Sequence, residues 1–461
     1  MGIPIIYLNG SALPLKNPKI KLVQRINNHA KMYLTAVLTG EEPEKYVEAM
    51  DTGAGLMLSY QEDDDKRTLL FKGLISQVRI KMVADVAHLV AEAVSYTIKL
   101  DEEKRSRSYQ NKNMPYKAIL DKVLARYKEA NCTHPLRDET IQNFTLQYEE
   151  TDWEFLKRMA SRFGWGLIPD PLTSKQQFYF GLPDGTQKGK LSSYNYSVTR
   201  KAEPNDSNLL YYKVQTKGMS GQRLSIGDET QFRNMTLWVL QSSTMIRHSA
   251  LWHEYVLTTK EGMQQELILN ESIRGMTLKS KVIGLEQDHV KVFFYEIDKD
   301  KPAVAETHAF PYATFYTSEG NTGWYCMPEL FDFVDVYFPS NKEQDAIITH
   351  SIRRRSKGGD FIKDPAVKLF MTKYRKAIIF DQHEILITGQ DDEVVIRLLD
   401  DHGIELRSTK DIRVKADGTL SLKAGNTVQI TAKDAIGLKC KTSLLEMDGN
   451  VSITGAKVNI Q

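Results

Sequence analysis

The sequence predicts a mainly β protein whose carboxyl-terminal part forms an intertwined trimeric β-helix or β-prism. The first observation behind this prediction is a series of short runs in which apolar and polar residues alternate, separated by turn residues. The second is an apolar repeat of eight residues that begins at about residue 391. Helical periodicity is expected in two stretches, near 115–129 and 152–163.

Length and composition restrict the class of protein. A chain of 461 residues is too long for one ordinary core, and this length favours about three or four domains. Its 41% hydrophobic and 26% charged residues are typical of a soluble globular protein. Nucleic-acid binders concentrate positive charge, so a formal net charge of +2 predicts that no nucleic acid is specifically bound.

The first residues and the cysteines indicate where the chain folds. Residues 1–15 lack the basic segment and the long apolar run of a secretory signal, and no stretch reaches membrane-spanning length. Cys132, Cys326 and Cys440 are few and far apart, which predicts free thiols in a reducing compartment. We therefore expect the chain to be made in the cytoplasm without a signal peptide.

The amino-terminal residues read as short strands. Residues 3–100 include alternating runs such as Lys31–Leu38 and Leu69–Ile80, bounded by turn signals. They predict a small barrel or sheet domain.

Two helices are predicted after this block. Apolar residues on one helical face predict an amphipathic helix over 115–129, beginning after Pro115. For the second helix, over 152–163, Thr151 and Glu154 have the spacing of a capping box, and Gly164 follows its last turn.

The second helical stretch also carries a resemblance to a known family. It reads Thr151-Asp152-Trp153-Glu154-Phe155-Leu156-Lys157-Arg158-Met159-Ala160 and is followed by Phe163-Gly164. This sequence resembles the hub domain of the valine-glycine repeat (VgrG) proteins of type VI secretion and of phage late control D-like proteins, which are fused hub and spike proteins. The resemblance implies tandem β-barrel hub domains with inserted helices over residues 1–275, forming a trimeric collar.

Residues 276–356 are predicted to form a small barrel. Strands are expected at Val290–Tyr295, Phe333–Phe338 and Ala346–Ile352. The segment resembles the oligonucleotide/oligosaccharide-binding-type (OB-type) barrel of the same family through Gly323-Trp324, Met327-Pro328, Val334–Phe338 and Ile347–Thr349. Phe331 departs from the family, which commonly has glycine at this place.

Residues 357–390 are expected to be a linker that leads into a shaft. They follow the basic run Arg353–Arg355 and reach Ile378–Asp381, which resembles the way the family begins its shaft. Some phage relatives insert a lysozyme at this junction. The linker is too short to hold an independently folded domain.

The shaft is predicted over residues 391–461 from two apolar columns with a spacing of eight. Polar residues lie between the columns, so each repeat reads as one strand with one buried face, followed by a turn such as Asp417-Gly418 or Gly425-Asn426. The predicted shaft core consists of Ile396, Leu398, Ile404, Leu406, Ile412, Val414, Leu420, Leu422, Val428, Ile430, Ile436, Leu438 and Leu444.

A single copy of this repeat cannot enclose a core. Each repeat supplies one strand of about five residues and one turn, which makes one side of a prism. Three identical chains around one axis would supply the other sides and bury both columns. Near the end the spacing shortens to seven, and Val458, Ile460 and Gln461 are expected to contact a tip partner, such as a PAAR-like tip protein.

Candidate chemistry has a simpler explanation at each position. Asp63–Asp65 lack an ordered cation loop, and His248 and His253 lack the spacing of a zinc hydrolase. Asp152 and Glu154 could be imagined as a glycosidase pair, but helix capping explains both acids. We therefore predict no catalytic residues, no metal and no cofactor.

Together these observations predict a structural protein and not an enzyme. The expected role is the homotrimeric central hub and spike of a contractile injection system, which punctures a target cell envelope and binds tail-tube and baseplate proteins. A trimeric adhesive tail fibre, or a carrier spike for a separate effector, is the alternative. Phage tail, tailocin and type VI apparatus remain equally compatible with the sequence.

Overall fold

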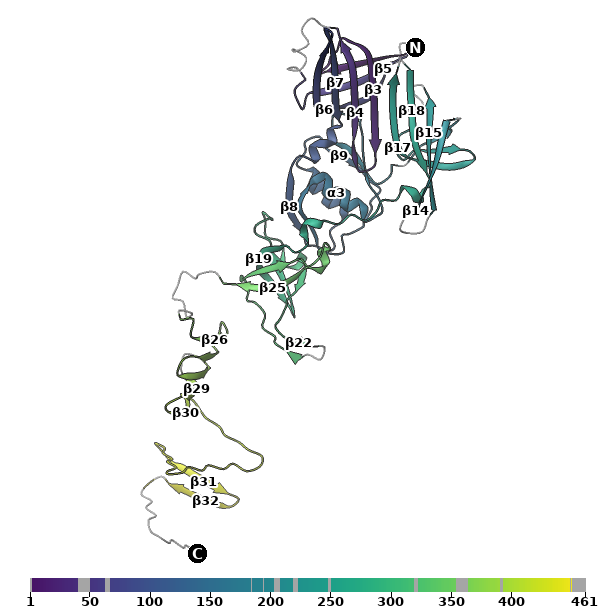
Figure 1. Ribbon diagram of the computed structural model, residues 1–461. Helices are drawn as coiled ribbons and strands as arrows, with labels where there is room; N and C mark the ends of the chain where they lie inside the picture. The colour runs from purple at the N-terminus through teal and green to yellow at the C-terminus, as the bar shows by residue number, and fades with distance from the viewer. Residues whose placement is uncertain are drawn as a thin grey trace. The chain divides into compact units, whose positions relative to one another are not determined.

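The computed structural model describes residues 2–447 and 449, apart from gaps at 40–49, 63–66, 184, 194, 203–207, 219–222, 248–249, 319–321, 354–363 and 390–392. The chain divides into two compact units, Met1–Arg354 and Arg355–Gln461 (Figure 1). The described residues of both units are mainly strands, with two short α-helices in the first. The prediction of a mainly β protein is confirmed.

The largest sheet of the first unit has thirteen strands. It joins two sequence-distant halves, because β17 pairs antiparallel with β3 from Gln241↔Arg25 to Ile246↔Ile20. The order is β14-β15-β18-β17-β3-β4-β7-β6-β5-β1-β2, with β16 beside β17 and β13 beside β16. The strands are β1 (Ile3–Leu8), β2 (Ser11–Ala12), β3 (Leu15–Arg25), β4 (Asn28–Leu38), β5 (Gly55–Gln61), β6 (Arg67–Val83), β7 (Val86–Val94), β13 (Gln187–Lys190), β14 (Asn195–Ala202), β15 (Asn208–Lys217), β16 (Glu229–Phe232), β17 (Met235–Arg247) and β18 (Ala250–Thr258).

Alternation of side chains explains these strands. In β4, Met32, Leu34 and Ala36 are buried, whereas Lys31 and Thr35 between them are exposed. Residues two apart in a strand share a face, so this pattern places the apolar set in the core. The predicted runs at 31–38 and 69–80 lie within β4 and β6.

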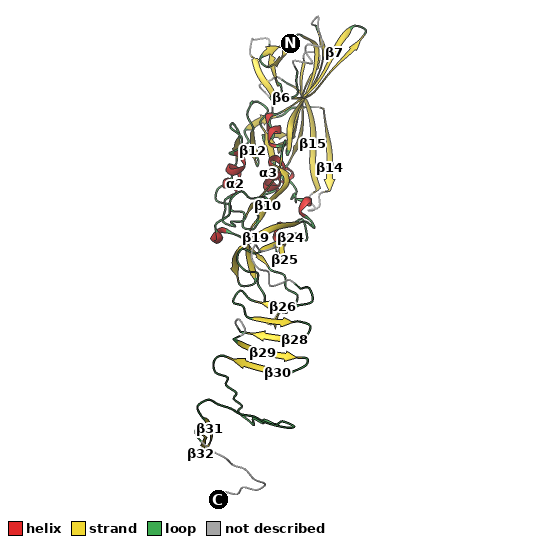
Figure 2. Cartoon of the chain, turned by 90° about the vertical axis from the view of Figure 1, so that its left-hand side faces the viewer, coloured by secondary structure: helices red, strands yellow, loops and turns green. Residues whose placement is uncertain are grey.

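The segment between the two halves of the large sheet carries the helices. Figure 2 shows α2 and α3 among short strands of the first unit. Here β8 pairs with β10, and β12 lies between β11 and β9. The elements are η1 (Tyr96–Leu100), β8 (Lys104–Tyr109), α2 (Tyr116–Leu124), β9 (Asn131–Thr133), β10 (Thr145–Thr151), α3 (Asp152–Ser161), β11 (Leu167–Pro169) and β12 (Gln177–Phe180).

One helix prediction is confirmed, and the other is too long. Thr151 caps α3 in a complete capping box with Glu154, and Gly164 has a φ of 68° just after the helix. The helix predicted over 115–129 ends at Leu124 instead. The Tyr127 hydroxyl donates a hydrogen bond of 2.9 Å to Asp152, which holds the chain in a turn where the helix was expected to continue.

A five-stranded sheet follows in the first unit, with the order β21-β20-β19-β24-β25. Its core includes Phe144 and Leu146 from the helix-bearing segment, so the two parts share buried apolar side chains. The three predicted strands of this region are present to within two residues at each end. The elements are η3 (Glu261–Met263), η4 (Glu271–Ile273), β19 (Thr277–Glu286), β20 (His289–Phe293), η5 (Val304–Glu306), β21 (Ala309–Pro311), β22 (Thr317–Ser318), β23 (Thr322–Gly323), β24 (Phe333–Tyr337), η6 (Glu343–Asp345) and β25 (Ile347–Ile352).

Phe331 lies in this region with a φ of 75°. Its backbone N–H donates to the Val282 carbonyl at 2.9 Å, and its ring is 60% exposed. A positive φ strains any residue that has a Cβ atom. The backbone therefore retains the left-handed turn that glycine would favour, although the sequence has phenylalanine.

The second unit consists of two small antiparallel sheets and an extended segment between them. The first sheet has the order β26-β27-β28-β29-β30, and the second is the β31–β32 hairpin. Figure 2 shows the strands of the first sheet following one another in sequence order. The strands are β26 (Lys368–Met371), β27 (Ala377–Phe380), β28 (Glu384–Thr388), β29 (Val394–Leu399), β30 (Gly403–Ser408), β31 (Ile436–Cys440) and β32 (Ser443–Met447).

Candidate functional site

One side of the β26–β30 sheet is apolar across all five strands. The pairing register aligns Ile378, Ile387 and Ile396 across successive strands, and it aligns Ile385 with Leu398 in the same way. Directly paired residues, and residues two apart in one strand, point to the same side of a sheet. We call this surface the apolar face; it consists of Phe370, Ile378, Phe380, Ile385, Ile387, Ile396, Leu398, Ile404 and Leu406.

The apolar face is open in the single chain. The exposed fraction of its side chains runs from 38% for Ile378 to 73% for Ile404, except that Ile385 is half-buried. The other side of the sheet carries Arg397, whose Nε lies 3.4 Å from a carboxylate oxygen of Glu384. The same side also carries Ile379, Leu386 and the buried Val395, so it is mixed in character. The apolar face is the side that is open to be covered by other apolar surface.

The extended segment 410–435 keeps the eight-residue period without pairing. Bends occur at residues 409–410, 417–418, 425–426 and 433–434, which are the joints of the repeat. Residues 410–435 make no backbone–backbone hydrogen bond with any other residue that the structure describes. The repeats centred on 413, 421 and 429 are therefore not strands in the single chain, because a strand needs a partner for its backbone groups.

The predicted shaft residues in this segment and in the hairpin are also exposed. The exposed fractions are 74% for Leu422 and 63% for Ile430. Ile436 is half-buried, and the remaining members are exposed, namely Ile412, Val414, Leu420, Val428, Leu438 and Leu444. The predicted tip residues Val458, Ile460 and Gln461 lie outside the described residues.

Sequence reasoning missed the first part of the apolar face. The columns were traced from residue 396 onward, but the short apolar runs Ile378–Phe380 and Ile385–Ile387 already belong to strands of the same sheet. Their spacing departs from eight because the turns between these strands differ in length. Short continuous apolar runs bounded by turn residues were the signal that could have found them.

A buried ion network supports the first unit. The Arg158 guanidinium lies 2.7 Å from carboxylate oxygens of both Glu150 and Glu343, and Arg162 binds the other oxygen of Glu343 at 2.9 Å. Burial raises the pKa of Glu150, although Arg158 opposes this shift. Burial works to lower the pKa of Arg158, but the two carboxylates outweigh it and raise that pKa. The network joins β10, α3 and η6.

Asp152 is a second buried charge, and it has a structural role. Its carboxylate, which is inaccessible to solvent, accepts hydrogen bonds from Arg107, Tyr127 and Gln147. Glu154 is instead engaged by the Thr151 backbone in the capping box. The interpretation of these acids as helix-capping residues is thus confirmed for Glu154, whereas Asp152 also anchors the neighbouring strand β8.

A hydroxyl–imidazole–carboxylate arrangement occurs elsewhere in the first unit. His29 Nδ1 lies 2.8 Å from Thr97 Oγ1, and His29 Nε2 lies 3.2 Å from Asp101. This sequence of contacts, from hydroxyl to imidazole to carboxylate, resembles that of a hydrolase catalytic triad. Thr97 is fully buried, however, so its hydroxyl cannot reach a substrate, and the arrangement is a structural contact.

The other positions considered for chemistry give no site. His253 is buried, with Nδ1 3.0 Å from Thr244 Oγ1. His248, Asp63–Asp65 and most of Arg353–Arg355 lie outside the described residues. Within the described part of the chain, no group of three or more His, Cys, Asp or Glu residues could hold a metal ion.

No described helix has the length and apolar character needed to cross a bilayer.

Comparison with known proteins finds one family match. Residues 47–168 match the family model described as phage tail baseplate hub (GPD). This segment contains the motif at 151–160 that suggested the resemblance. No curated protein matches the chain.

Solved structures show the same fold at low sequence identity. A type VI secretion component from E. coli, c3393, is 12% identical with a TM-score of 0.53, covering 76% of this chain and 99% of its own. The c3393 protein is itself structurally similar to the T4 bacteriophage tail proteins gp27 and gp5. The half-lidded Francisella PdpA-VgrG complex is 9% identical with a TM-score of 0.58, covering 88% of each chain.

These findings support the function expected from the sequence in its broad form, because the family match is to a phage tail baseplate hub and the solved structures share the fold of a type VI secretion component and a VgrG complex. The matching family is structural, not enzymatic. Residues 47–168 are thus similar to the phage tail baseplate hub (GPD) family, and the fold of the chain is that of VgrG-type proteins.

Proposed function

We propose that three copies of the chain form the central hub and spike of a contractile injection system. In this proposal residues 1–275 form a collar of duplicated barrels, 276–356 an OB-type barrel, 357–390 a linker and 391–461 a trimeric β-helix shaft. The observation that supports the proposal is the open apolar face, continued by an extended repeat with no backbone partner among the described residues of its own chain.

Three copies fit this surface for a physical reason. One chain supplies a single wall per layer, and a closed ring of identical walls buries every apolar side chain without leaving a sheet edge. The third column of the repeat contains only small side chains, Ser408, Ala416, Ala424, Ala432 and Cys440, where another backbone could approach closely. Covering a half-exposed aliphatic side chain contributes about 1 kcal/mol, so the shaft residues of three chains give a large total.

The proposal assigns the chain a mechanical task. The shaft would pierce the target cell envelope, and the collar would join it to the tail tube and baseplate. A tip protein would cover the last layer, where Val458, Ile460 and Gln461 are expected. The Francisella VgrG of similar fold was solved in complex with PdpA, which supports the idea that spikes of this fold take further protein partners.

The oligomeric state of the full chain tests the proposal. Analytical ultracentrifugation of the wild-type protein should give a trimer. Leu422→Asp should abolish the trimer, because it would bury three carboxylates around one axis. Ser421→Asp is the matched control: it adds the same charge at the adjacent position, on the polar side of the repeat, and should leave the trimer intact. A folded wild-type monomer would overturn the proposal.

The adhesive tail fibre is the alternative. It shares the trimeric shaft, so oligomeric state alone does not separate the two roles. Electron microscopy of the native particle does: a central spike lies on the tail axis beneath the tube, whereas a fibre projects from the side of the baseplate.

A further inference from the structure

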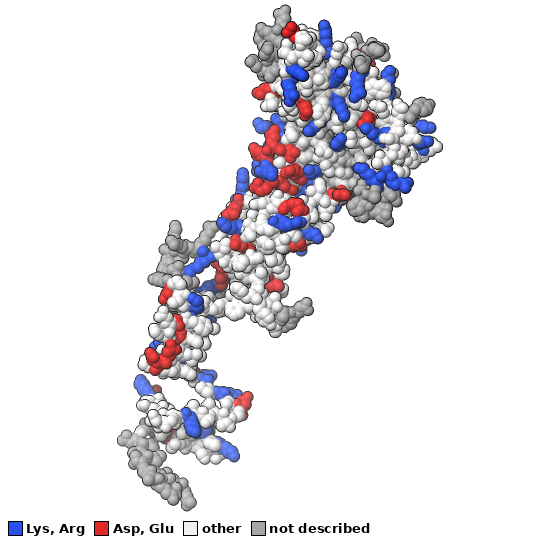
Figure 3. Space-filling model, viewed as in Figure 1, with Lys and Arg blue, Asp and Glu red and all other residues white. Residues whose placement is uncertain are grey.

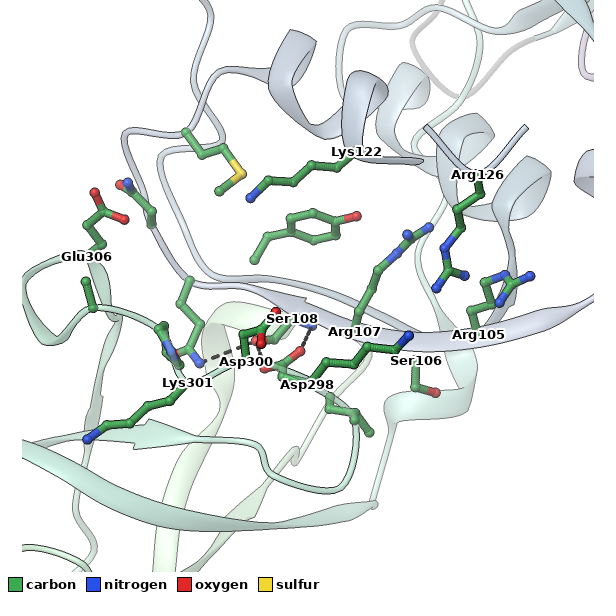
Figure 4. Close-up of a pocket in the computed structure, with 18 of the residues that line it drawn as sticks. Arg105, Ser106, Arg107, Ser108, Lys122, Arg126, Asp298, Asp300, Lys301 and Glu306 are labelled. Carbon is green, nitrogen blue, oxygen red and sulfur yellow. Dashed lines mark hydrogen bonds between the residues drawn. The ribbon is translucent and has the colours of Figure 1, made fainter. Parts of the chain in front are cut away.

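A cavity of about 570 Å³ opens in the first unit, on the side of β8 (Figure 4). One wall is formed by β8 and the end of α2, and the other by the segment that follows β20. Ser108 ties the walls together, because its backbone N–H and its hydroxyl both donate to the Asp298 carboxylate, at 2.8 Å and 2.5 Å. The cavity therefore has a fixed base.

Positive charge dominates the lining. It comprises seven Lys and Arg side chains and three carboxylates. Figure 4 shows Arg105, Arg107 and Arg126 close together, with Lys122 extending from α2. The cations are Lys104, Arg105, Arg107, Lys122 and Arg126 on the first wall and Lys299 and Lys301 on the second.

Several of these cations have no carboxylate partner. Arg105 and Arg107 face the buried Asp152, and Arg105 also pairs with Glu103. In contrast, Lys122, Arg126 and Lys299 form no ion pair with any residue that the structure describes. Figure 3 shows that the visible face of the first unit carries both kinds of charge, with many of its acidic side chains gathered in one cluster.

Buried polar atoms around the same cavity also lack partners. Tyr109 Oη and Gln110 Oε1 are inaccessible to solvent and have no hydrogen bond within the described residues. Both residues line the cavity. Burial raises the pKa of Tyr109 to about 12, although Arg107 acts in the opposite direction, so its hydroxyl stays protonated. Unpaired buried polar atoms are costly, so the wall of the cavity is under-satisfied beneath its charged surface.

We propose that this cavity binds a small ligand that carries at least two phosphate groups, of pyrophosphate size or larger. Phosphate oxygens accept several hydrogen bonds at once, which suits the Arg126 guanidinium and the Lys122 ammonium group. A second anionic group lets the ligand reach Lys299 on the opposite wall. Binding would then hold α2 and β8 against the segment after β20. This inference is independent of the proposed trimeric spike.

Isothermal titration calorimetry of the full chain with inorganic pyrophosphate tests the inference. In a chloride buffer of low ionic strength the wild-type protein should bind pyrophosphate more tightly than orthophosphate. The double variant Lys122→Gln/Arg126→Gln should weaken pyrophosphate binding by about 100-fold, roughly 10-fold for each charge-assisted contact.

The matched control is Lys117→Gln/Lys128→Gln. Both lysines are exposed, one on α2 and one just beyond it, and neither lines the cavity, so the net charge changes equally. This variant should bind pyrophosphate as the wild type does, and circular dichroism should show both double variants folded. The inference fails if pyrophosphate does not bind the wild-type protein. It also fails if the control weakens binding as much as the cavity variant, since that result would indicate diffuse surface charge.

Discussion

The two units of the chain differ in how far their apolar side chains are buried. The first unit buries them in several clusters within one chain, whereas Ala377 and Val395 are the only apolar residues buried among the described residues of the second. The backbone follows the same division, since the first unit pairs its strands internally and residues 410–435 make no backbone–backbone hydrogen bond within the described chain. We therefore expect the first unit to fold alone and the second to need other chains to complete its core.

The tryptophans allow the two units to be measured separately. All five, Trp153, Trp165, Trp238, Trp252 and Trp324, lie in the first unit. Tryptophan fluorescence of the full chain thus reports unfolding of the first unit, and sedimentation reports association through the second. The predictions below use this separation.

The largest expected effect is at the buried ion network. Arg158→Met should lower the free energy of unfolding of the first unit by about 3–5 kcal/mol, because it leaves Glu150 buried without its partner. In the second unit Arg397→Met should change stability by less than about 1 kcal/mol, since Arg397 is partly exposed. Urea denaturation followed by tryptophan fluorescence measures the first value, and equal losses for both variants would contradict this contrast.

Truncating a core side chain should have an effect that is independent of protein concentration in the first unit and dependent on it in the second. Leu156→Ala removes a fully buried side chain and should cost the first unit about 2–5 kcal/mol at every concentration. Leu420→Ala should leave the tryptophan transition unchanged and should raise the concentration at which the trimer dissociates. Sedimentation over a dilution series checks the second result. A Leu420→Ala protein that dissociates like the wild type would remove this residue from the shaft core.

The sequence predicted the features that depend on short-range patterns. The capping box at Thr151 and Glu154 was readable because it joins residues three apart. The partners of Arg158 were not, because Glu343 lies 185 positions away and no local pattern links them. The phosphate cavity was missed for the same reason, since its two walls come from β8 and from the segment after β20.

The response to pH should differ between the units because their carboxylates differ in burial. Burial raises the pKa of Glu150 above its unfolded value, so its contribution to stability is present below about pH 4 and is lost as the pH rises through the folded pKa. Asp381, an exposed turn residue of the second unit, has its pKa lowered by the backbone N–H of His383, and its contribution has the opposite sign.

Glu150→Gln isolates the first of these effects. The difference in unfolding free energy between wild type and variant should favour the variant increasingly as the pH rises from about 4 to 7. Asp298, whose pKa is also raised by burial, and Asp101, whose pKa is lowered by the His29 hydrogen bond, are present in both proteins and cancel in the difference. A difference that does not change with pH would mean that Glu150 titrates alike in the folded and unfolded states.

The smallest expected effect compares one turn in each unit. Phe331, at a φ of 75°, should be replaced favourably by glycine, because left-handed strain of about 1–2 kcal/mol outweighs the conformational entropy that glycine loses. The net gain in the tryptophan transition should be about 0.5–1 kcal/mol, and Phe331→Ala, which keeps a Cβ atom, should give none. Gly403, at a φ of 82° between β29 and β30, is the converse case. Gly403→Ala should weaken trimer association without moving the tryptophan transition, and a shift in that transition would show that the two units do not fold independently.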